Sequence, residues 1–561
     1  MAADEPPVPR TLRVATWNVA AVNNNPFEYF VSHDDPGYDV LMGSVEAFVE
    51  APGVRDITVG EIITDVMLDE LCALMTGHGL SGLEKTREYW FANLKPRRIV
   101  SQFLKDPEIG AKRLCSMPDR VTNTIRSGSS TLYRPTIINC YEPEMPDVKS
   151  WWTQWKEYMF FTSATVATKS GTGDSKKICH LLDAIKKAKY PAVTTEEETI
   201  SIPLQLVCMA AFDGVLVHLV NLLAPNKWHD VKTSMVAALH VNKTKRTLEI
   251  LAGPVYASCD AIFIQEAAAG FVDDLVSDTV LNDRYHVLVP EQLDGKRDQN
   301  SLVLVSKNRF MVDDPEWRGE VTDDVLKLMD SQSKKGVAPG DLFAVRVLEK
   351  NTKHRDSKDS NRRGTDKGNN TSGTDKGNSS TGGRFILASF HGDTNGLASV
   401  PVIDAVDKFT KLLDVNLPTP SAENGLPRLP PTLVFGLDAN THVTHSAGKR
   451  QGVLEFVEHL QKIQLATCWG TQIDPQINTT YNARTFLQPQ LNKAVRMCDM
   501  ESSPLTDKHP KDHIVFGSNS FSTQIVQRDN TGDGQFIDDT PFPTMSFPSD
   551  HALVCATLEM E

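Results

Sequence analysis

The sequence has no surplus of positive charge, no paired cysteine motif and no basic, apolar leader at its start. Its 58 Lys and Arg against 72 Asp and Glu give a formal net charge of −14. This charge argues against indiscriminate coating of nucleic acid but leaves room for a local basic groove.

The nine cysteines are scattered without a C-x-x-C pair, so we expect buried thiols, a reducing compartment and no zinc site. The start, MAADEPPVPRTLRV, lacks the features of a signal peptide, and an intracellular protein, cytoplasmic or nuclear, is therefore expected.

A membrane span is not expected either. The most apolar stretch, residues 202–223, carries Gln205, Asp213 and His218. A charge at the centre of a bilayer costs about 2.5–3.5 kcal/mol. We therefore expect a buried helix at this position.

Short apolar runs alternate with helical patterns over much of the chain. A length of 561 residues indicates two or three domains, or one large domain with an insertion. Strands are expected at 12–22, 259–268, 285–290, 301–306, 341–349, 384–391, 432–439, 512–517 and 551–558, and helices at 234–253, 402–416 and 452–463. Such a mixture predicts a layered α/β (α+β) fold.

Two segments interrupt this pattern. Residues 36–229 are expected to form a mainly helical insertion, with a helix at 59–75 and a core-packing Trp151/Trp155 pair at i,i+4 spacing. Residues 350–384 are basic, of low complexity, and contain GTDKGN twice, so we expect a disordered loop within the main domain. It is either a plain solvated loop or a loose tether for a polyanion. The main domain would then comprise residues 1–35 and 230–561.

Polar residues stand at or next to the ends of the expected strands. They are Asn18, Glu266, His391, Asp438, Asn440, Asp512, Asp550 and His551. Taken singly, each is more easily explained as a turn former or a helix cap. Strand ends converge in layered α/β folds, however, so together these residues predict one polar pocket.

This set of residue types favours one kind of chemistry. Carboxylate oxygens without cysteine suit Mg²⁺, or Mn²⁺ as an alternative. A carboxylate beside an amide can orient and deprotonate a water, and two histidines can donate hydrogen bonds to a pentacoordinate phosphorus. The pattern predicts metal-assisted hydrolysis of phosphoesters.

The order of the motifs carries a resemblance. ATWN, FIQE, SFHGDT, an Asp-x-Asn after an apolar strand, KDHIVF and FPSDH resemble the endonuclease/exonuclease/phosphatase superfamily, which has the DNase I-like fold. The resemblance covers about residues 10–28 and 232–558, with both interruptions outside it. It implies a two-sheet α/β sandwich with a large, mainly helical insertion after the first strand.

The resemblance also implies a metal site. Glu266 would be the main Mg²⁺ ligand, and Asn18 would support it at the floor of the site. Asp550 would help hold the metal or tune His551. Because the insertion joins the chain after Asn18, we expect it to form a helical lid or wall beside the pocket.

The remaining roles concern the phosphate and the attacking water. His391 would hold a non-bridging phosphate oxygen, and Asp438, assisted by Asn440, would orient and activate the water. Asp512 would belong to the supporting hydrogen-bond network, and His551 would stabilise the phosphorane.

Two motifs depart from the usual family pattern. Gly-Asp-x-Asn is stretched here to Gly-Leu-Asp-Ala-Asn at 436–440, and Asp-Tyr-Ile reads Asp512-His513-Ile514. Neither departure removes a catalytic group, so an active enzyme is expected.

The substrate is less well defined by the sequence. The leading hypothesis is a phosphodiesterase or nuclease acting on nucleic acid, with Lys296, Arg297 and the 350–384 loop as candidates for a basic groove. A phosphatase of small phosphorylated metabolites or inositol phosphates, and a non-enzymatic scaffold, are the alternatives. The FPSDH motif and the helix at 452–463 look most similar to the deadenylase and tyrosyl-DNA phosphodiesterase branches, without deciding between them.

Overall fold

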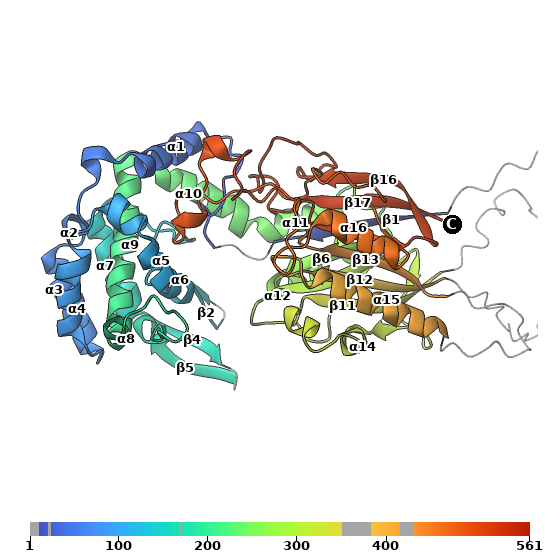
Figure 1. Ribbon diagram of the computed structural model, residues 1–561, viewed down its shortest axis with the longest axis horizontal. Coiled ribbons are helices and arrows are strands. Elements are labelled where there is room, and N and C mark those ends of the chain that lie inside the picture. The colour runs from blue at the N-terminus through green and yellow to red at the C-terminus, as the bar shows by residue number, and fades with distance from the viewer. Residues whose placement is uncertain (1–9, 21–23, 129, 169–170, 351–382, 416–429) are drawn as a thin grey trace, which may run out of the picture.

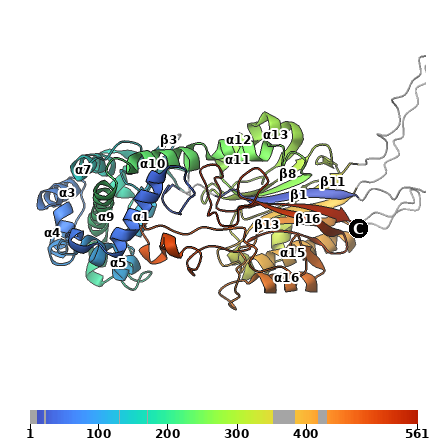
Figure 2. The same cartoon turned by 90° about the horizontal axis from the view of Figure 1, so that it is seen from above.

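The computed structural model describes residues 10–20, 24–128, 130–168, 171–350, 383–415 and 430–561. A helical lobe and a β-sandwich lobe follow each other along the long axis (Figure 1). The C-terminus lies at the end of the sandwich remote from the helical lobe, in both this view and the view from above (Figure 2).

The first sheet has six strands in the order β16-β17-β1-β6-β8-β7. Their bounds are β1 (Thr11–Asn18), β6 (Ala261–Ala267), β7 (Tyr285–Leu288), β8 (Asn300–Ser306), β16 (Phe521–Asp529) and β17 (Leu553–Met560). β1 runs parallel to β6 and antiparallel to β17. Side chains alternate along β1, so Leu12 and Val14 enter one core and Ala15 and Trp17 another.

The second sheet has the order β10-β11-β12-β13-β15-β14, with β9 paired to β11. The strands are β9 (Phe310–Met311), β10 (Gly319–Glu320), β11 (Leu342–Glu349), β12 (Arg384–His391), β13 (Thr432–Asp438), β14 (Leu465–Thr467) and β15 (Asp512–Gly517). β12 and β13 are parallel, and β15 is antiparallel to β13.

The two sheets face each other across a buried apolar core. Phe263 of β6 and Val434 of β13 belong to it. The sheets approach closely at Gly436, where a Cβ would lie 2.4 Å from the Phe263 side chain. This two-sheet sandwich with helices outside confirms the predicted fold class.

Helices cover the outer face of each sheet. The first sheet is covered by α11 (Lys243–Ala252), α12 (Ala269–Ser277) and α13 (Thr279–Arg284), and the second by α14 (Thr322–Lys327), α15 (Ser399–Val415) and α16 (Val453–Lys462). A 3₁₀ turn at Ser333–Gly336 precedes β11, and two more at Leu491–Lys493 and Met497–Asp499 lie between β14 and β15.

The helical lobe is inserted between β1 and β6. Its α-helices are α1 (Pro36–Glu50), α2 (Val59–Ile62), α3 (Asp65–Gly77), α4 (Leu83–Tyr89), α5 (Pro107–Lys112), α6 (Ser116–Thr122), α7 (Val148–Lys156), α8 (Thr195–Thr199), α9 (Ser201–Leu223) and α10 (Trp228–Val236). Its strands form two hairpins, β2 (Thr124–Ser127) with β3 (Ser130–Tyr133) and β4 (Ser163–Thr168) with β5 (Gly171–Lys177). Short π-helical turns lie at Trp90–Leu94, Ile99–Leu104, Glu157–Phe161 and Ala237–Val241, and 3₁₀ turns at Gly53–Arg55 and Ile178–Leu181.

Helix α9 is the centre of this lobe. By length and composition it could cross a membrane, yet 78% of its most apolar window is buried within the protein. Its Asp213 accepts hydrogen bonds from the buried Arg134 and from Trp155 Nε1. The tryptophan is a core residue, as the sequence predicts.

The core of the helical lobe extends beyond the predicted insertion. Phe27 and Phe30, before α1, and Ala483 and Leu487, from the segment between β14 and β15, are buried in it. Chain segments on both sides of residues 36–229 therefore bind the helical lobe to the sandwich.

Several element bounds differ from the sequence predictions. The first strand ends at Asn18, and residues 21–23 lie outside the described part of the chain. The helix expected at 234–253 is divided by a π turn and Asn242, and that at 59–75 is divided at residues 63–64. β16 was not predicted. Of the expected loop, residues 351–382 are outside the described residues, whereas Arg384 begins β12 and is buried.

Candidate active site

The polar strand ends meet at one edge of the sandwich. His391 is the register partner of Asp438, which is in turn the partner of Asp512. Three strands therefore present one row of titratable side chains. The buried Gln265 joins the two sheets behind this row, because its Nε2 donates to Ser389 Oγ at 2.9 Å.

Asn18, at the end of β1, lies between two carboxylates. Its Nδ2 donates to Glu266 Oε1 at 3.1 Å and to Asp438 Oδ2 at 3.0 Å. Its Oδ1 accepts the N–H of Ala20 at 2.8 Å, and its side chain is fully buried. The amide is thereby held in one orientation.

Glu266 stands in a bulge at the end of β6. The pairing register with β8 shifts between Ile264 and Ala267, and Glu266 has a φ of 55°. This left-handed conformation is unfavourable for a residue with a Cβ, by about 1–3 kcal/mol, and bulges commonly redirect a side chain near a functional site. Gln299 Nε2 holds the other oxygen, Oε2, at 3.0 Å.

His391, the last residue of β12, lies near both carboxylates that accept hydrogen bonds from Asn18, those of Glu266 and Asp438. Its Nε2 is 3.0 Å from Glu266 Oε1 and 3.7 Å from Asp438 Oδ2. Burial alone would lower its pKa, but the Glu266 carboxylate and its neighbours raise the pKa of His391 well above the ordinary value. These carboxylates therefore favour the protonated form of the imidazole.

Asp438 is fixed by the turn that follows β13. The Asn440 N–H donates to its Oδ1 at 2.9 Å, and Asn440 Nδ2 donates to Gly392 O at 2.9 Å. Asn440 has a φ of 49°, a conformation that Asn tolerates better than most residues. The Asp-x-Asn unit thus fixes Asp438 and ties it to the loop after His391.

His551 lies against a buried aspartate at the start of β15. Its Nδ1 is 3.0 Å from Asp512 Oδ2, which also accepts the Thr479 hydroxyl at 2.6 Å. Its Nε2 is 3.7 Å from Asp438 Oδ2. Burial alone would lower the pKa of His551, but the Asp512 and Asp438 carboxylates raise it to about 10.

Asp550 borders the site without joining its ligand groups. It lines a pocket of about 350 Å³ together with Glu266, Gln299 and Lys243. Burial raises the pKa of Asp550, while burial lowers that of Lys243 to about 8. A direct role of Asp550 in metal binding stays a prediction.

The two candidate basic residues differ in their surroundings. Arg297 donates to Asp341 Oδ1 at 2.6 Å, and that oxygen is 3.9 Å from His391 Nδ1. Arg297 is thus connected to the site through Asp341. Lys296 is exposed, and its backbone N–H donates to Asp294 at 3.0 Å.

Two groups of possible metal ligands share Asp438. In Glu266, His391 and Asp438, and again in Asp438, Asp512 and His551, the ligand atoms lie within 4.8 Å of one another. A third such group in the described residues, His78, Cys179 and His180, lies in the helical lobe. Oxygen-rich donors suit a hard divalent cation, so the group of Glu266 and Asp438 fits Mg²⁺ or Mn²⁺.

Some residues at the site were missed by the sequence reasoning. Gln299 and Asp341 immediately precede β8 and β11, which begin at the edge where their antiparallel neighbours β6 and β12 end. A search of polar residues at strand starts would have found both. Arg126 of β2 and Lys243 of α11, which line a pocket with Glu266, carry no comparable signal because distant segments bring them there.

Comparisons with known proteins give two kinds of result. Residues 56–233 match a family described as a domain of unknown function (DUF8234). No curated protein matches the chain in sequence.

Several solved structures are similar in fold. They include D. rerio TDP2 complexed with single-strand DNA product (12% identity, covering 57% of this chain and 92% of that chain, TM-score 0.32). Another is the human Nocturnin catalytic domain with bound sulfate, with 11% identity, covering 56% of this chain and 86% of that chain, and a TM-score of 0.31. A third is ANGEL2, a 2′,3′-cyclic phosphatase, in complex with adenosine-2′,3′-vanadate, with 10% identity, covering 58% of this chain and 87% of that chain, and a TM-score of 0.33.

The fold is DNase I-like. Two facing sheets form a sandwich, and the ends of their strands meet at one edge, as the motifs predicted.

Proposed function

We propose that this chain is a divalent-metal-dependent phosphodiesterase that acts on nucleic acid. The observation that carries the proposal is the arrangement around Asn18: two carboxylates on one amide, with the imidazoles of His391 and His551 each 3.7 Å from the Asp438 carboxylate. Hydrolysis of a phosphoester needs a site for a cation, a base for water and donors for the phosphate oxygens. These residue types meet each need.

Glu266 and Asp438, whose carboxylate oxygens lie within 4.8 Å of each other, would hold the cation. A divalent ion bound there would offset the charge of the phosphate and make a bound water more acidic. Asn18 and Gln299 keep the carboxylates in place through hydrogen bonds at 3.0–3.1 Å. Such supporting contacts to metal ligands commonly affect affinity about 10–100-fold.

The side chains of the chain would carry the proton and the phosphate charge. Asp438, held by the Asn440 N–H, would accept the proton of the attacking water. His391 and His551, whose pKa values the neighbouring carboxylates raise, would donate hydrogen bonds to non-bridging oxygens. Asp512 would keep His551 oriented through Nδ1.

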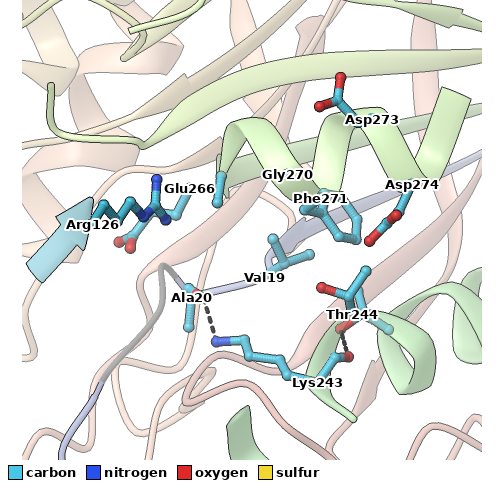
Figure 3. A pocket seen from close by; sticks show the side chains of 12 residues that line it. Val19, Ala20, Arg126, Lys243, Thr244, Glu266, Gly270, Phe271, Asp273 and Asp274 are labelled. Atoms are coloured by element: carbon cyan, nitrogen blue, oxygen red, sulfur yellow. Dashed lines mark hydrogen bonds between the residues drawn. The ribbon is translucent and has the colours of Figure 1, made fainter. Parts of the chain in front are cut away.

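Basic side chains around the pocket support a polyanionic substrate. Arg126 and Lys243 line a pocket that includes Glu266 (Figure 3). Arg297 donates a hydrogen bond to Asp341, whose carboxylate is near His391. The three basic residues come from three separate segments, and the overall charge is −14. Each of the two arginines pairs with a carboxylate, Arg126 with Asp298 and Arg297 with Asp341, so a phosphate would have to compete with these pairs, which suits directed rather than indiscriminate binding of nucleic acid.

The proposal is tested by incubating the full chain with labelled DNA and RNA oligonucleotides and with small phosphate monoesters, each with Mg²⁺ or Mn²⁺. We expect salt-sensitive cleavage of an oligonucleotide that is lost in Asp438→Asn. Release of inorganic phosphate from the small esters alone would instead identify a phosphatase. Absence of all cleavage with every divalent metal would refute enzymatic activity.

A further inference from the structure

Three side chains that can bind a metal meet in the helical lobe, away from the candidate active site. They are His78, Cys179 and His180, and one possible ligand atom from each lies within 4.8 Å of the other two. Helix α3, which ends immediately before His78, lies at the end of the lobe remote from the sandwich in both views (Figure 1 and Figure 2). This group is therefore separate from the site of Glu266 and Asp438.

The group joins two distant parts of the chain. His78 is the C-terminal cap of α3, and Cys179 and His180 belong to the 3₁₀ turn Ile178–Leu181. The rings of His78 and His180 meet edge to face, with their centroids 5.5 Å apart. The sequence predicted no zinc site because it lacks C-x-x-C pairs, but ligands that the fold brings together do not need such a pair.

The hydrogen bonds of the turn suit a metal ligand. His180 Nε2 lies 3.1 Å from the carbonyl oxygen of His78, and an N–H donated there leaves the lone pair on Nδ1. Histidines that bind metals commonly donate their second ring N–H in this way. Burial raises the pKa of the Cys179 thiol to about 11, against the backbone N–H groups of Cys179 and His180, which favour the thiolate. A metal that binds this sulfur replaces the thiol proton, which passes to solvent.

The surroundings of the group suit a cation. Helix α3 has 13 residues, and the C-terminus of a helix carries a partial negative charge. Phe160 and Phe161 pack against the His78 ring, with centroids 5.4 and 6.5 Å from it. Lys177, immediately before the turn, donates to the carbonyl oxygen of Phe161 at 2.6 Å. Its ammonium group is therefore already held by a backbone acceptor.

We propose that His78, Cys179 and His180 bind one Zn²⁺ ion, with a water in the fourth position. A thiolate and two imidazoles are ligands that Zn²⁺ prefers, in tetrahedral geometry. Ligand atoms of such an ion lie about 3.3–3.8 Å apart, since Zn–N is about 2.0 Å and Zn–S about 2.3 Å, so the group needs only a small contraction. His180 is exposed, which gives the ion access from solvent. The bound ion links the end of α3 to the turn at 178–181 and stabilises the helical lobe.

Co²⁺ in place of Zn²⁺ tests the site in the full chain, because a thiolate bound to Co²⁺ gives a charge-transfer band in the near ultraviolet. Neither group of possible ligands around Asp438 contains a cysteine, so Co²⁺ bound at the candidate active site does not produce this band. We expect the band to saturate at one equivalent of Co²⁺ and to disappear when Zn²⁺ displaces it. Absence of the band in the wild type would overturn the proposal, whether or not the protein hydrolyses phosphoesters.

His180→Ala removes an exposed ligand, so the fold should be retained. We expect the Kd for Co²⁺ to rise at least about 100-fold, since even the loss of an outer partner commonly costs 10–100-fold. His229→Ala is the matched control, because His229 is another histidine of the lobe whose ring meets an aromatic ring, that of Trp228, edge to face. Cys498→Ser removes an exposed thiol and should keep the band. An unchanged affinity in His180→Ala, or loss of the band in Cys498→Ser, would overturn the assignment.

Thermal unfolding tests the link between the two segments. Because Zn²⁺ also suits the carboxylates of the candidate active site, the comparison uses Glu266→Gln with and without the additional change His180→Ala. Zn²⁺ added to metal-free protein should raise the Tm of Glu266→Gln, because the ion binds the folded chain. The double variant should show little increase. Equal increases in the two proteins would contradict a zinc ion that joins α3 to the turn.

Discussion

Glu266 and Asp438 accept hydrogen bonds from the same nitrogen, Nδ2 of Asn18, at 3.1 and 3.0 Å. The two carboxylates come from different sheets, since Glu266 is the last residue but one of β6 and Asp438 is the last residue of β13. One buried amide thus fixes the distance between the sheets at the edge where the proposed cation would bind. Several consequences can be measured.

Replacing Asn18 by Ala should reduce both activity and stability. The two carboxylates would lose their shared donor, which costs about 1–3 kcal/mol when a buried polar group is left without a partner. We expect kcat/KM to fall about 100-fold, and a higher Mg²⁺ concentration for half-maximal rate. A matched control is Asn221→Ala, which removes an amide that also bonds to two acceptors, Met145 O and Val217 O, at 2.9 Å. Equal Mg²⁺ dependence in both variants would contradict the assignment.

Gln299→Ala should weaken metal binding without changing the substrate contacts. Gln299 holds Glu266 Oε2 at 3.0 Å, and the loss of such a contact commonly lowers metal affinity about 10–100-fold. The measurement is the rate as a function of Mn²⁺ concentration. At saturating metal, we expect the maximal rate to recover to within a few-fold of wild type. Gln461→Ala, whose exposed amide bonds to Thr471 O, should behave as wild type; a Gln299 variant with unaltered metal dependence would refute this role.

Asp512→Asn should reduce kcat much more than it changes KM. The Asp512 carboxylate raises the pKa of His551 and orients its Nδ1, and the neutral amide does neither. By analogy with other carboxylate–histidine pairs, kcat should fall about 100-fold or more. Steady-state kinetics on an oligonucleotide provide the test. Asp56→Asn, a buried carboxylate that accepts two backbone N–H groups in the helical lobe, is the control, and a similar loss in both would indicate a folding defect.

His513 should make the protein less stable in acid. Burial lowers its pKa from the ordinary 6.5 to about 4, and Phe456 packs against its ring at 4.9 Å. Between these two pH values the unfolded chain takes up a proton that the folded chain does not. The free energy of unfolding therefore falls as pH decreases from 6.5 to 4, by about 3 kcal/mol in total.

Urea unfolding at pH 7, 5.5 and 4.5 measures this effect. His513→Gln removes the titrating group, so its free energy of unfolding should depend less steeply on pH than that of the wild type. Parallel pH profiles for the two proteins would show that His513 does not contribute. Other buried histidines titrate equally in both proteins, which leaves the difference specific to this position.

The sandwich was predictable from the sequence because its strands are short, apolar and ended by polar residues. Strand ends on one edge of a sandwich converge whatever the length and sequence of the connecting loops. The site residues Asn18, Glu266, His391 and Asp438 could therefore be named from the sequence. β16 was not predicted, since only its first and last residues are buried and its sequence shows little alternation of apolar and polar residues.

The neighbours of the site were harder to predict, because they depend on tertiary contacts. Gln299 and Asp341 precede strands rather than follow them, and only the antiparallel pairing with β6 and β12 brings them to the edge. Arg126 comes from an insertion whose placement no local pattern encodes. It reaches the pocket through its pairing with Asp298.

The initial rate of oligonucleotide cleavage as a function of Mg²⁺ concentration, for wild type and Glu266→Gln, tests the central claim most directly. Gln keeps the size of the side chain and removes the charge that would hold the cation. We expect saturable, Mg²⁺-dependent cleavage by the wild type, abolished by EDTA, and a rate lowered at least about 100-fold in Glu266→Gln. Cleavage by Glu266→Gln at the wild-type rate and with the wild-type Mg²⁺ dependence would contradict the account.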